Sequence, residues 1–225
     1  MHPDAARGAL RRIVFWRHGR TDWNAAGRFQ GQTDIPLNEE GLRQAERAAR
    51  RLASLSPSAI VASDLDRTRA TAEALATVTG LTVQVDSGLR ETNAGVWQGH
   101  TFDAIRSMDP EALHRWEDGD VNTAAGGAET RLDVAARVHR AVDRALAGVP
   151  ADGTLVVVSH GGAIRVGLAH LLGLPHDLWG ALAGLSNCSW SILEERRPHH
   201  DGTLRWRLGE HNAGTLPVPV TVEEG

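Results

Sequence analysis

The sequence lacks several residue types and segments, and each absence narrows the kind of protein it encodes. It has no lysine, no tyrosine and one cysteine, Cys188, which cannot form a disulfide within the chain. A chain without disulfides is typical of a reducing compartment, so we expect a cytoplasmic protein. No apolar run approaches the roughly 20 residues that span a membrane, and the N-terminus has no apolar signal segment. We therefore expect no membrane partner.

The length and charge of the chain narrow the class of protein further. Its 225 residues suffice for one domain with a large core. We predict a single domain over residues 1–225, with residues 1–10 and 212–225 as flexible ends. The formal net charge is −4 at pH 7, although all 24 basic residues are arginine. This balance argues against nucleic acid as a partner.

Apolar runs of strand length alternate with helical patterns along most of the chain. One helix is predicted to begin after Asn38, a typical N-cap, and another to stop near Gly80. This alternation predicts a three-layer α/β/α sandwich with a mainly parallel central sheet and a C-terminal antiparallel hairpin. The predicted strands are residues 11–16, 59–62, 81–85, 154–158, 189–193 and 204–208. Besides the helix after Asn38 and a short one starting at 109–110, the predicted helices are residues 65–79, 129–146 and 162–172.

Two of these strands each end in a histidine followed by glycine. Arg17 and His18 follow the first strand, and His160 and Gly161 follow the fourth. Ligands of open α/β sheets bind at the carboxyl ends of the strands. A neutral imidazole is a nucleophile toward phosphorus, and the guanidinium of Arg17 offers two parallel donors to phosphate oxygens. His160 and the start of the next helix, at Gly161, would stabilise charge on a phosphoryl group. Each histidine alone would also fit a buried strand end.

Two further segments can reach the same edge of the sheet. Arg67 lies on the first turn of the helix after the second strand, where it would be a second phosphate clamp. Glu91 follows the third strand and would donate a proton to the departing alkoxide, a role that requires a carboxyl pKa raised by partial burial. The alternatives are an exposed helical arginine and a loop carboxylate paired with Arg90. Together the four segments predict a pocket for a phosphate ester.

The motifs resemble those of the histidine phosphatase superfamily, in its phosphoglycerate-mutase-like branch. The matching segments are residues 17–24, 30–37, 63–72, 89–99 and 159–162, in the order and spacing of that family. The resemblance implies a phosphomonoester hydrolase that acts on a small phosphorylated metabolite through a phosphohistidine, with no cofactor and no metal. Family members are often homodimers, so the resemblance also implies a homodimer.

The resemblance assigns roles to individual residues. It implies that His18 is the phosphorylated nucleophile and Glu91 the proton donor. It also implies that Gln30 lies in the pocket wall. The residues that bind the phosphate would be Arg17, Asn24, Gln30, Gly31, Arg67, His160 and Gly161.

Other segments resemble a narrower group, the actinobacterial glucosyl-3-phosphoglycerate phosphatases. These segments are residues 89–92, 97–99, 131–137, 187–190 and 205–208. The resemblance makes glucosyl-3-phosphoglycerate a candidate substrate. The sequence does not reveal the residues that would bind the alcohol portion of the substrate.

Three alternatives remain open at this point. A mutase-type phosphotransferase would use the same phosphohistidine, but the residues after Glu91 do not resemble the Glu-Arg-His-Tyr-Gly segment of the mutases. A non-catalytic phosphoester-binding module would be expected to lack the nucleophile or the acid, and both are present. A metalloenzyme is disfavoured because the 11 histidines, His170, His176 and His199 among them, show no metal-ligand spacing.

Overall fold

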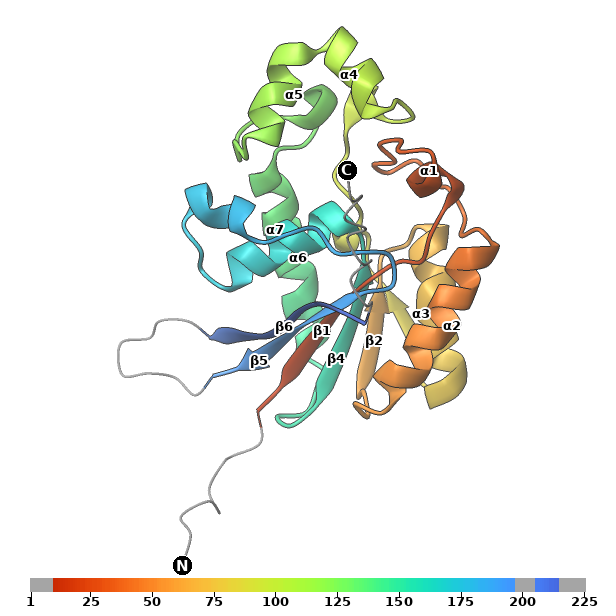
Figure 1. Ribbon diagram of the computed structural model, residues 1–225. Coiled ribbons are helices and arrows are strands. Elements are labelled where there is room, and N and C mark those ends of the chain that lie inside the picture. Colours follow the sequence, from red (N-terminus) through yellow and green to blue (C-terminus); the bar gives the residue numbers. More distant parts are fainter. Residues whose placement is uncertain (1–9, 197–204, 215–225) are drawn as a thin grey trace, which may run out of the picture.

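A six-stranded sheet forms the centre of the computed structural model shown in Figure 1, which describes residues 10–196 and 205–214. The strand order is β3-β2-β4-β1-β5-β6. The four strands on one side are parallel to one another: β1 (Arg12–Arg17), β2 (Ala59–Ala62), β3 (Val83–Val85) and β4 (Thr154–Ser159). The antiparallel strands β5 (Trp190–Glu195) and β6 (Trp206–Ala213) complete the other side. The carboxyl ends of β1 and β4 therefore lie next to each other.

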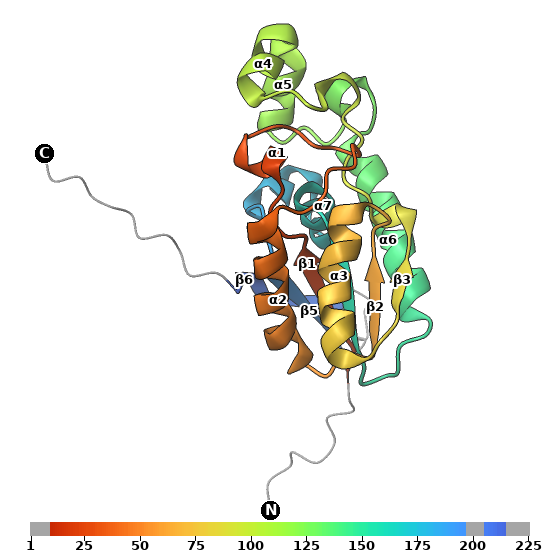
Figure 2. The same ribbon diagram turned by 90° about the vertical axis from the view of Figure 1, so that its right-hand side faces the viewer.

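Helices cover both faces of the sheet (Figure 2). On one face, α2 (Glu39–Ala53) and α3 (Asp66–Thr79) pack against Val14 and Trp16 of β1. On the other face, α6 (Arg131–Leu146) and α7 (Gly161–Leu171) pack against Ile13 and Phe15. All four side chains are fully buried, because successive strand residues point to opposite faces and each face is covered. The predicted three-layer α/β/α sandwich is confirmed.

A smaller group of elements covers the carboxyl ends of the parallel strands, at the top of Figure 1. Trp97 and Leu113 are buried in its own apolar cluster, against which Phe29 and Trp116 pack. The Trp97 indole donates to Asp109 at 3.0 Å. We call this group the cap; it consists of α1 (Asp22–Ala25), α4 (Phe102–Met108), α5 (Pro110–Glu117) and the 3-10 helices η2 (Gly95–Trp97) and η3 (Ala125–Gly127). Two further 3-10 helices, η1 (Ser87–Leu89) and η4 (His176–Ala181), lie outside the cap.

Most predicted boundaries agree with the structure to within two residues. Asn38 caps α2 by accepting from the Gly41 N–H, and Gly80 ends α3 with φ of +74°. The helix predicted from residue 129 begins two residues later, because Thr130 forms a capping box with Asp133. The last strand was predicted at 204–208 but spans 206–213, since its pairing with β5 continues past two register shifts. Most of the loop predicted between these two strands lies outside the described residues.

The predicted flexible ends lie mostly outside the described residues. Residues 1–9 and 215–225 are not described, whereas β6 continues to Ala213. Within the described ranges, no helix has the length and apolar character needed to cross a membrane.

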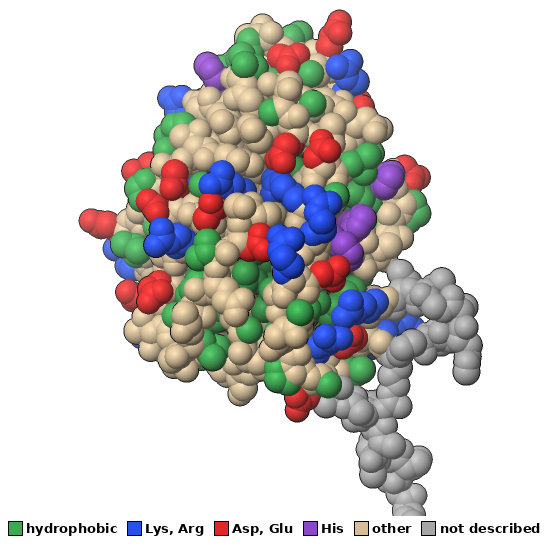
Figure 3. Space-filling model, turned by 180° about the vertical axis from the view of Figure 1, so that it is seen from behind, with side chains coloured by type: hydrophobic (Ala, Val, Ile, Leu, Met, Phe, Trp, Pro, Cys, Tyr) green, Lys and Arg blue, Asp and Glu red, His purple; other side chains and the backbone are tan. Residues whose placement is uncertain are grey.

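The surface seen from behind carries arginines interspersed with acidic side chains (Figure 3). Many arginines of the described chain form ion pairs, such as Arg144 with Asp86 at 2.8 Å and Arg90 with Asp64. Mixed charge of this kind differs from the continuous basic footprint that is typical of nucleic-acid-binding proteins.

Candidate active site

A pocket of about 280 Å³ lies at the carboxyl end of β1, beneath the cap. His18 and Arg67 at its base are almost completely buried, whereas Phe102 at its rim is 42% exposed. The residues that line it are Arg17, His18, Trp23, Asn24, Gly27, Arg28, Phe29, Gln30, Gly31, Arg67, Glu91 and Phe102. Residues from the predicted segments 17–24, 30–37, 63–72 and 89–99 therefore meet in one cavity, whereas His160 and Gly161 do not line it. Its polar base and its partly aromatic rim suit a ligand with an anionic end.

One ring nitrogen of His18 has a hydrogen-bond partner, and the other has none among the residues that the structure describes. Its Nδ1 lies 2.7 Å from the carbonyl oxygen of Gly19, a contact that requires a proton on Nδ1. The lone pair is therefore on Nε2, as a nucleophile requires. Burial and the neighbouring Arg17 and Arg67 guanidinium groups lower the pKa of His18 well below 6.5. The imidazole is neutral at neutral pH and ready to attack.

Arg67 and His160 form a buried hydrogen-bonded pair behind the nucleophile. The Nε of Arg67 donates to His160 Nδ1 at 3.2 Å, so the one N–H of the neutral His160 ring is at Nε2, 3.0 Å from Ser63 Oγ. Arg67 also donates to the carbonyl oxygens of Gly31 at 2.7 Å and Thr33 at 2.8 Å. Burial lowers the pKa of Arg67 to about 10, so the guanidinium stays charged. The alternative of an exposed helical arginine is wrong, because Arg67 is fully buried.

The imidazole rings of His18 and His160 are in contact with each other. Their ring centroids are 5.2 Å apart at an interplanar angle of 61°. His18 lines the pocket, whereas His160 is fully buried and does not. Burial and the charge of Arg67 lower the pKa of His160 well below 6.5 as well. In this geometry His160 orients Arg67 and packs against the nucleophile, and its predicted contact with phosphate stays a prediction.

Several polar atoms around the nucleophile have no partner within the described residues. Arg17 donates from Nη1 to the carbonyl oxygen of Leu185, but its buried Nε has no partner there, nor has the buried Oε1 of Gln30. The Asn24 Oδ1 accepts from the Thr21 N–H and from Asn187 Nδ2, which leaves the Asn24 amide nitrogen available to the pocket. Polar groups without a protein partner at the base of a pocket are available to hydrogen-bond a ligand.

Glu91 reaches the pocket from the segment after β3. Its carboxylate accepts from the backbone N–H groups of Gly162 and Ala163 at the start of α7, both at 2.9 Å, and from the N–H of Thr92 at 2.8 Å. Free N–H groups at a helix N-terminus favour a carboxylate in this position. Arg90 pairs with Asp64 instead of with Glu91, so the alternative of a carboxylate neutralised by its neighbour is wrong.

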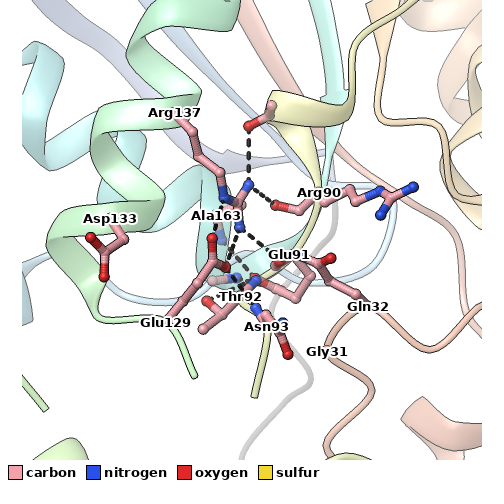
Figure 4. A network of polar contacts seen from close by, with 12 residues as sticks. Gly31, Gln32, Arg90, Glu91, Thr92, Asn93, Glu129, Asp133, Arg137 and Ala163 are labelled. Atoms are coloured by element: carbon pink, nitrogen blue, oxygen red, sulfur yellow. Dashed lines mark hydrogen bonds and ion pairs between the residues drawn. The ribbon is translucent and has the colours of Figure 1, made fainter. Parts of the chain in front are cut away.

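Sequence reasoning missed the residues that hold the backbone of this site. Asn187 donates to the carbonyl oxygens of His18 and Gly19, at 3.1 and 3.3 Å. Arg137 and Glu129 surround the backbone next to Glu91 (Figure 4). The helical spacing held one indication for Arg137, which lies three residues after the buried Val134 and four before the buried Ala141 on α6. A charged residue on an apolar helix face requires a buried partner.

In the described part of the chain, neither Cys188 nor the histidines outside the pocket form a second reactive or metal-binding site. No cluster of three potential metal ligands occurs there, while His199 and His200 lie outside it. Burial raises the pKa of Cys188 to about 12, so its thiol is unreactive.

Comparison with known proteins identifies the family. The sequence profile of the Histidine phosphatase superfamily (branch 1) matches residues 13–207. The chain belongs to this superfamily. It is 43% identical over 212 residues to a glucosyl-3-phosphoglycerate phosphatase of Mycobacterium tuberculosis, an alignment that covers 90% of this chain and 95% of the relative. It is also 41% identical over 186 residues to a probable phosphoglycerate mutase, GpmB, of Yersinia pestis, which covers 81% and 84% of the two chains.

The solved structures show the same fold. A mycobacterial glucosyl-3-phosphoglycerate phosphatase in complex with VO3 superposes with a TM-score of 0.83 at 44% identity, over 91% of this chain and all of that one. The histidine phosphatase fold expected from the motifs is therefore confirmed.

Proposed function

We propose that this histidine phosphatase is a phosphomonoester hydrolase that works through a phosphohistidine, with glucosyl-3-phosphoglycerate as its substrate. The observation that carries the proposal is the state of His18, a neutral imidazole with Nε2 unprotonated, in the same pocket as Glu91. The similarity to named glucosyl-3-phosphoglycerate phosphatases supports the choice of substrate.

The first step is attack of His18 Nε2 on phosphorus. The Nε of Arg17, the amide nitrogen of Asn24 and the charged Arg67 stabilise the negative charge of the phosphoryl group. The proposal requires Glu91 to carry a proton when the phosphate ester is bound. Glu91 then delivers the proton to the departing oxygen as the bond from phosphorus to the alkoxide breaks.

The second step returns His18 to its free form. Glu91, now ionised, accepts a proton from water while the water oxygen attacks the phosphohistidine. The N–H groups of Gly162 and Ala163 keep the carboxyl group in place between the two steps. Inorganic phosphate then leaves.

The pocket rim suits the alcohol portion of this substrate. Arg28 lines the rim and donates to the carbonyl oxygen of Gly99 at 2.6 Å, and its guanidinium has no carboxylate partner within the described residues. It would bind the carboxylate of the glycerate portion. Trp23 and Phe102 present aromatic faces beside it, against which a glucosyl ring would pack.

The test is phosphate release from glucosyl-3-phosphoglycerate, with acid-quenched enzyme analysed for phosphohistidine at His18. We expect turnover and a labelled His18 in the wild type, and neither in His18→Ala. His139→Ala is the matched control, since His139 lies outside the pocket and pairs with Asp143. Interconversion of phosphoglycerates with a bisphosphate primer, in place of phosphate release, would establish a mutase instead. Binding without turnover would establish a binding module.

The proposal also includes a homodimer located in the cytoplasm. The resemblance to the family supports the dimer, and the single buried Cys188 fits a reducing compartment. Sedimentation of the purified protein at the mass of a monomer would contradict the dimer.

A further inference from the structure

Arg137 is a largely buried cation in the network of Figure 4, and the mechanism above does not use it. Its side chain on α6 is 15% exposed. It donates to the backbone carbonyl oxygens of Gly88 at 3.0 Å, of Arg90, and of Glu91 at 2.8 Å. One side chain therefore holds three carbonyl groups of the segment that carries the candidate proton donor.

Glu129 fixes the orientation of this guanidinium. The Nε of Arg137 donates to Glu129 Oε1 and its Nη2 to Oε2, both at 2.9 Å, in the bidentate geometry that only arginine provides. The same Oε2 accepts from the backbone N–H of Asn93 at 2.7 Å. The ion pair thus forms hydrogen bonds with the backbone both before and after Glu91.

We propose that Arg137, oriented by Glu129, is a positioning residue that sets the location of the Glu91 carboxyl group for proton transfer. The proposal rests on the role of Glu91 in the proposed function. The side chain of Glu91 meets the N-terminus of α7, while its backbone is fixed by Arg137 and by Gln32 Nε2, which donates to the Glu91 carbonyl oxygen at 3.0 Å. The segment around Glu91 forms neither an α-helix nor a strand, so its backbone depends on long-range contacts such as these.

The size of the expected effect follows from the geometry of proton transfer. A displacement of about 1 Å in a reacting group costs about 100-fold in rate. Loss of the Arg137 guanidinium frees three carbonyl groups and leaves the Glu129 carboxylate without its cation. Arg137→Ala is therefore expected to lower kcat/KM for an alkyl phosphate by about 100-fold. An aryl phosphate with a good leaving group needs no proton donor, so its kcat/KM is expected to change by about threefold or less.

The experiment compares kcat/KM for glycerol 3-phosphate and for 2,4-dinitrophenyl phosphate in five proteins. These are the wild type, Glu91→Gln, Arg137→Ala, the double variant Glu91→Gln/Arg137→Ala, and Arg144→Ala. Arg144 is the matched control, because it lies on the same helix and pairs with Asp86 but touches no carbonyl group of the Glu91 segment. Arg137→Lys and Glu129→Gln provide milder variants should Arg137→Ala fail to fold, which thermal unfolding will show.

A residue that acts through Glu91 gives a characteristic pattern. Arg137→Ala should lose activity on the alkyl phosphate alone, and should cost little more in the Glu91→Gln background. Equal losses on both substrates, or losses that add in the double variant, would overturn the positioning role and leave a structural one. An unchanged alkyl phosphate activity in folded Arg137→Lys and Glu129→Gln would also overturn it.

The proposed function fails in a different way. If the wild type hydrolyses neither ester, or if Glu91→Gln shows no dependence on the leaving group, then the mechanism is wrong independently of Arg137.

Discussion

Replacing Gly162 with alanine should remove most proton-donor activity without destabilising the fold. A Cβ at this position would lie 2.6 Å from Glu91 Oε1, 3.2 Å from its Cδ and 3.3 Å from its Oε2. The Glu91 carboxylate has to withdraw by about 1 Å to reach an ordinary contact distance, and a displacement of this size costs about 100-fold in rate. Alanine is also favoured over glycine in a helix by about 0.5–1 kcal/mol. Gly162→Ala should therefore unfold at the same temperature as the wild type or higher.

The assay measures kcat/KM for glycerol 3-phosphate and for 2,4-dinitrophenyl phosphate, together with the thermal midpoint. We expect about a 100-fold loss on the alkyl ester and little change on the aryl ester. Gly148→Ala is the control, because a Cβ there meets no atom within 4 Å. Normal kcat/KM for glycerol 3-phosphate in Gly162→Ala would refute the reasoning that the position of the Glu91 carboxylate limits the rate.

Three further predictions concern charge, pH and metal. Arg17→Lys should lower kcat/KM at least about 100-fold on every ester, because an ammonium cannot replace the buried Nε, which has no partner among the described residues. Near-normal kinetics would contradict this. The native state keeps His18 and His160 neutral, whereas unfolded histidines bind a proton below a pH of about 6.5. The unfolded state thus binds more protons, so each histidine should reduce the free energy of unfolding by up to about 1.4 kcal/mol per pH unit below pH 6.5. Urea unfolding at several pH values tests this, and a slope unchanged in His160→Gln would count against it. Chelators should leave phosphate release intact, and activity that chelation abolishes and zinc restores would show a metal requirement.

Sequence patterns alone determined much of the fold and of the site. Apolar runs predicted the strands, and the position of His18 and His160 just after two of them predicted that both lie at one edge of the sheet. Parallel strands bring their carboxyl ends together, so the sequence alone predicts that the two histidines lie at the same edge.

The contacts that set the protonation and the orientation of the site residues depend on the tertiary structure. Arg67 meets His160 across 93 positions of sequence, and Glu91 meets Gly162 across 71. Such contacts follow from the order of the strands, in which β4 lies between β1 and β2, and no local pattern specifies that order. The edge contact of the two imidazoles and the hydrogen bonds from Arg137 to the Glu91 backbone also follow from the order of the strands. The local sequence thus determines which chemical groups are present at the site. Long-range packing determines their protonation, their partners and their positions, because burial and neighbouring charge exist only in the folded chain.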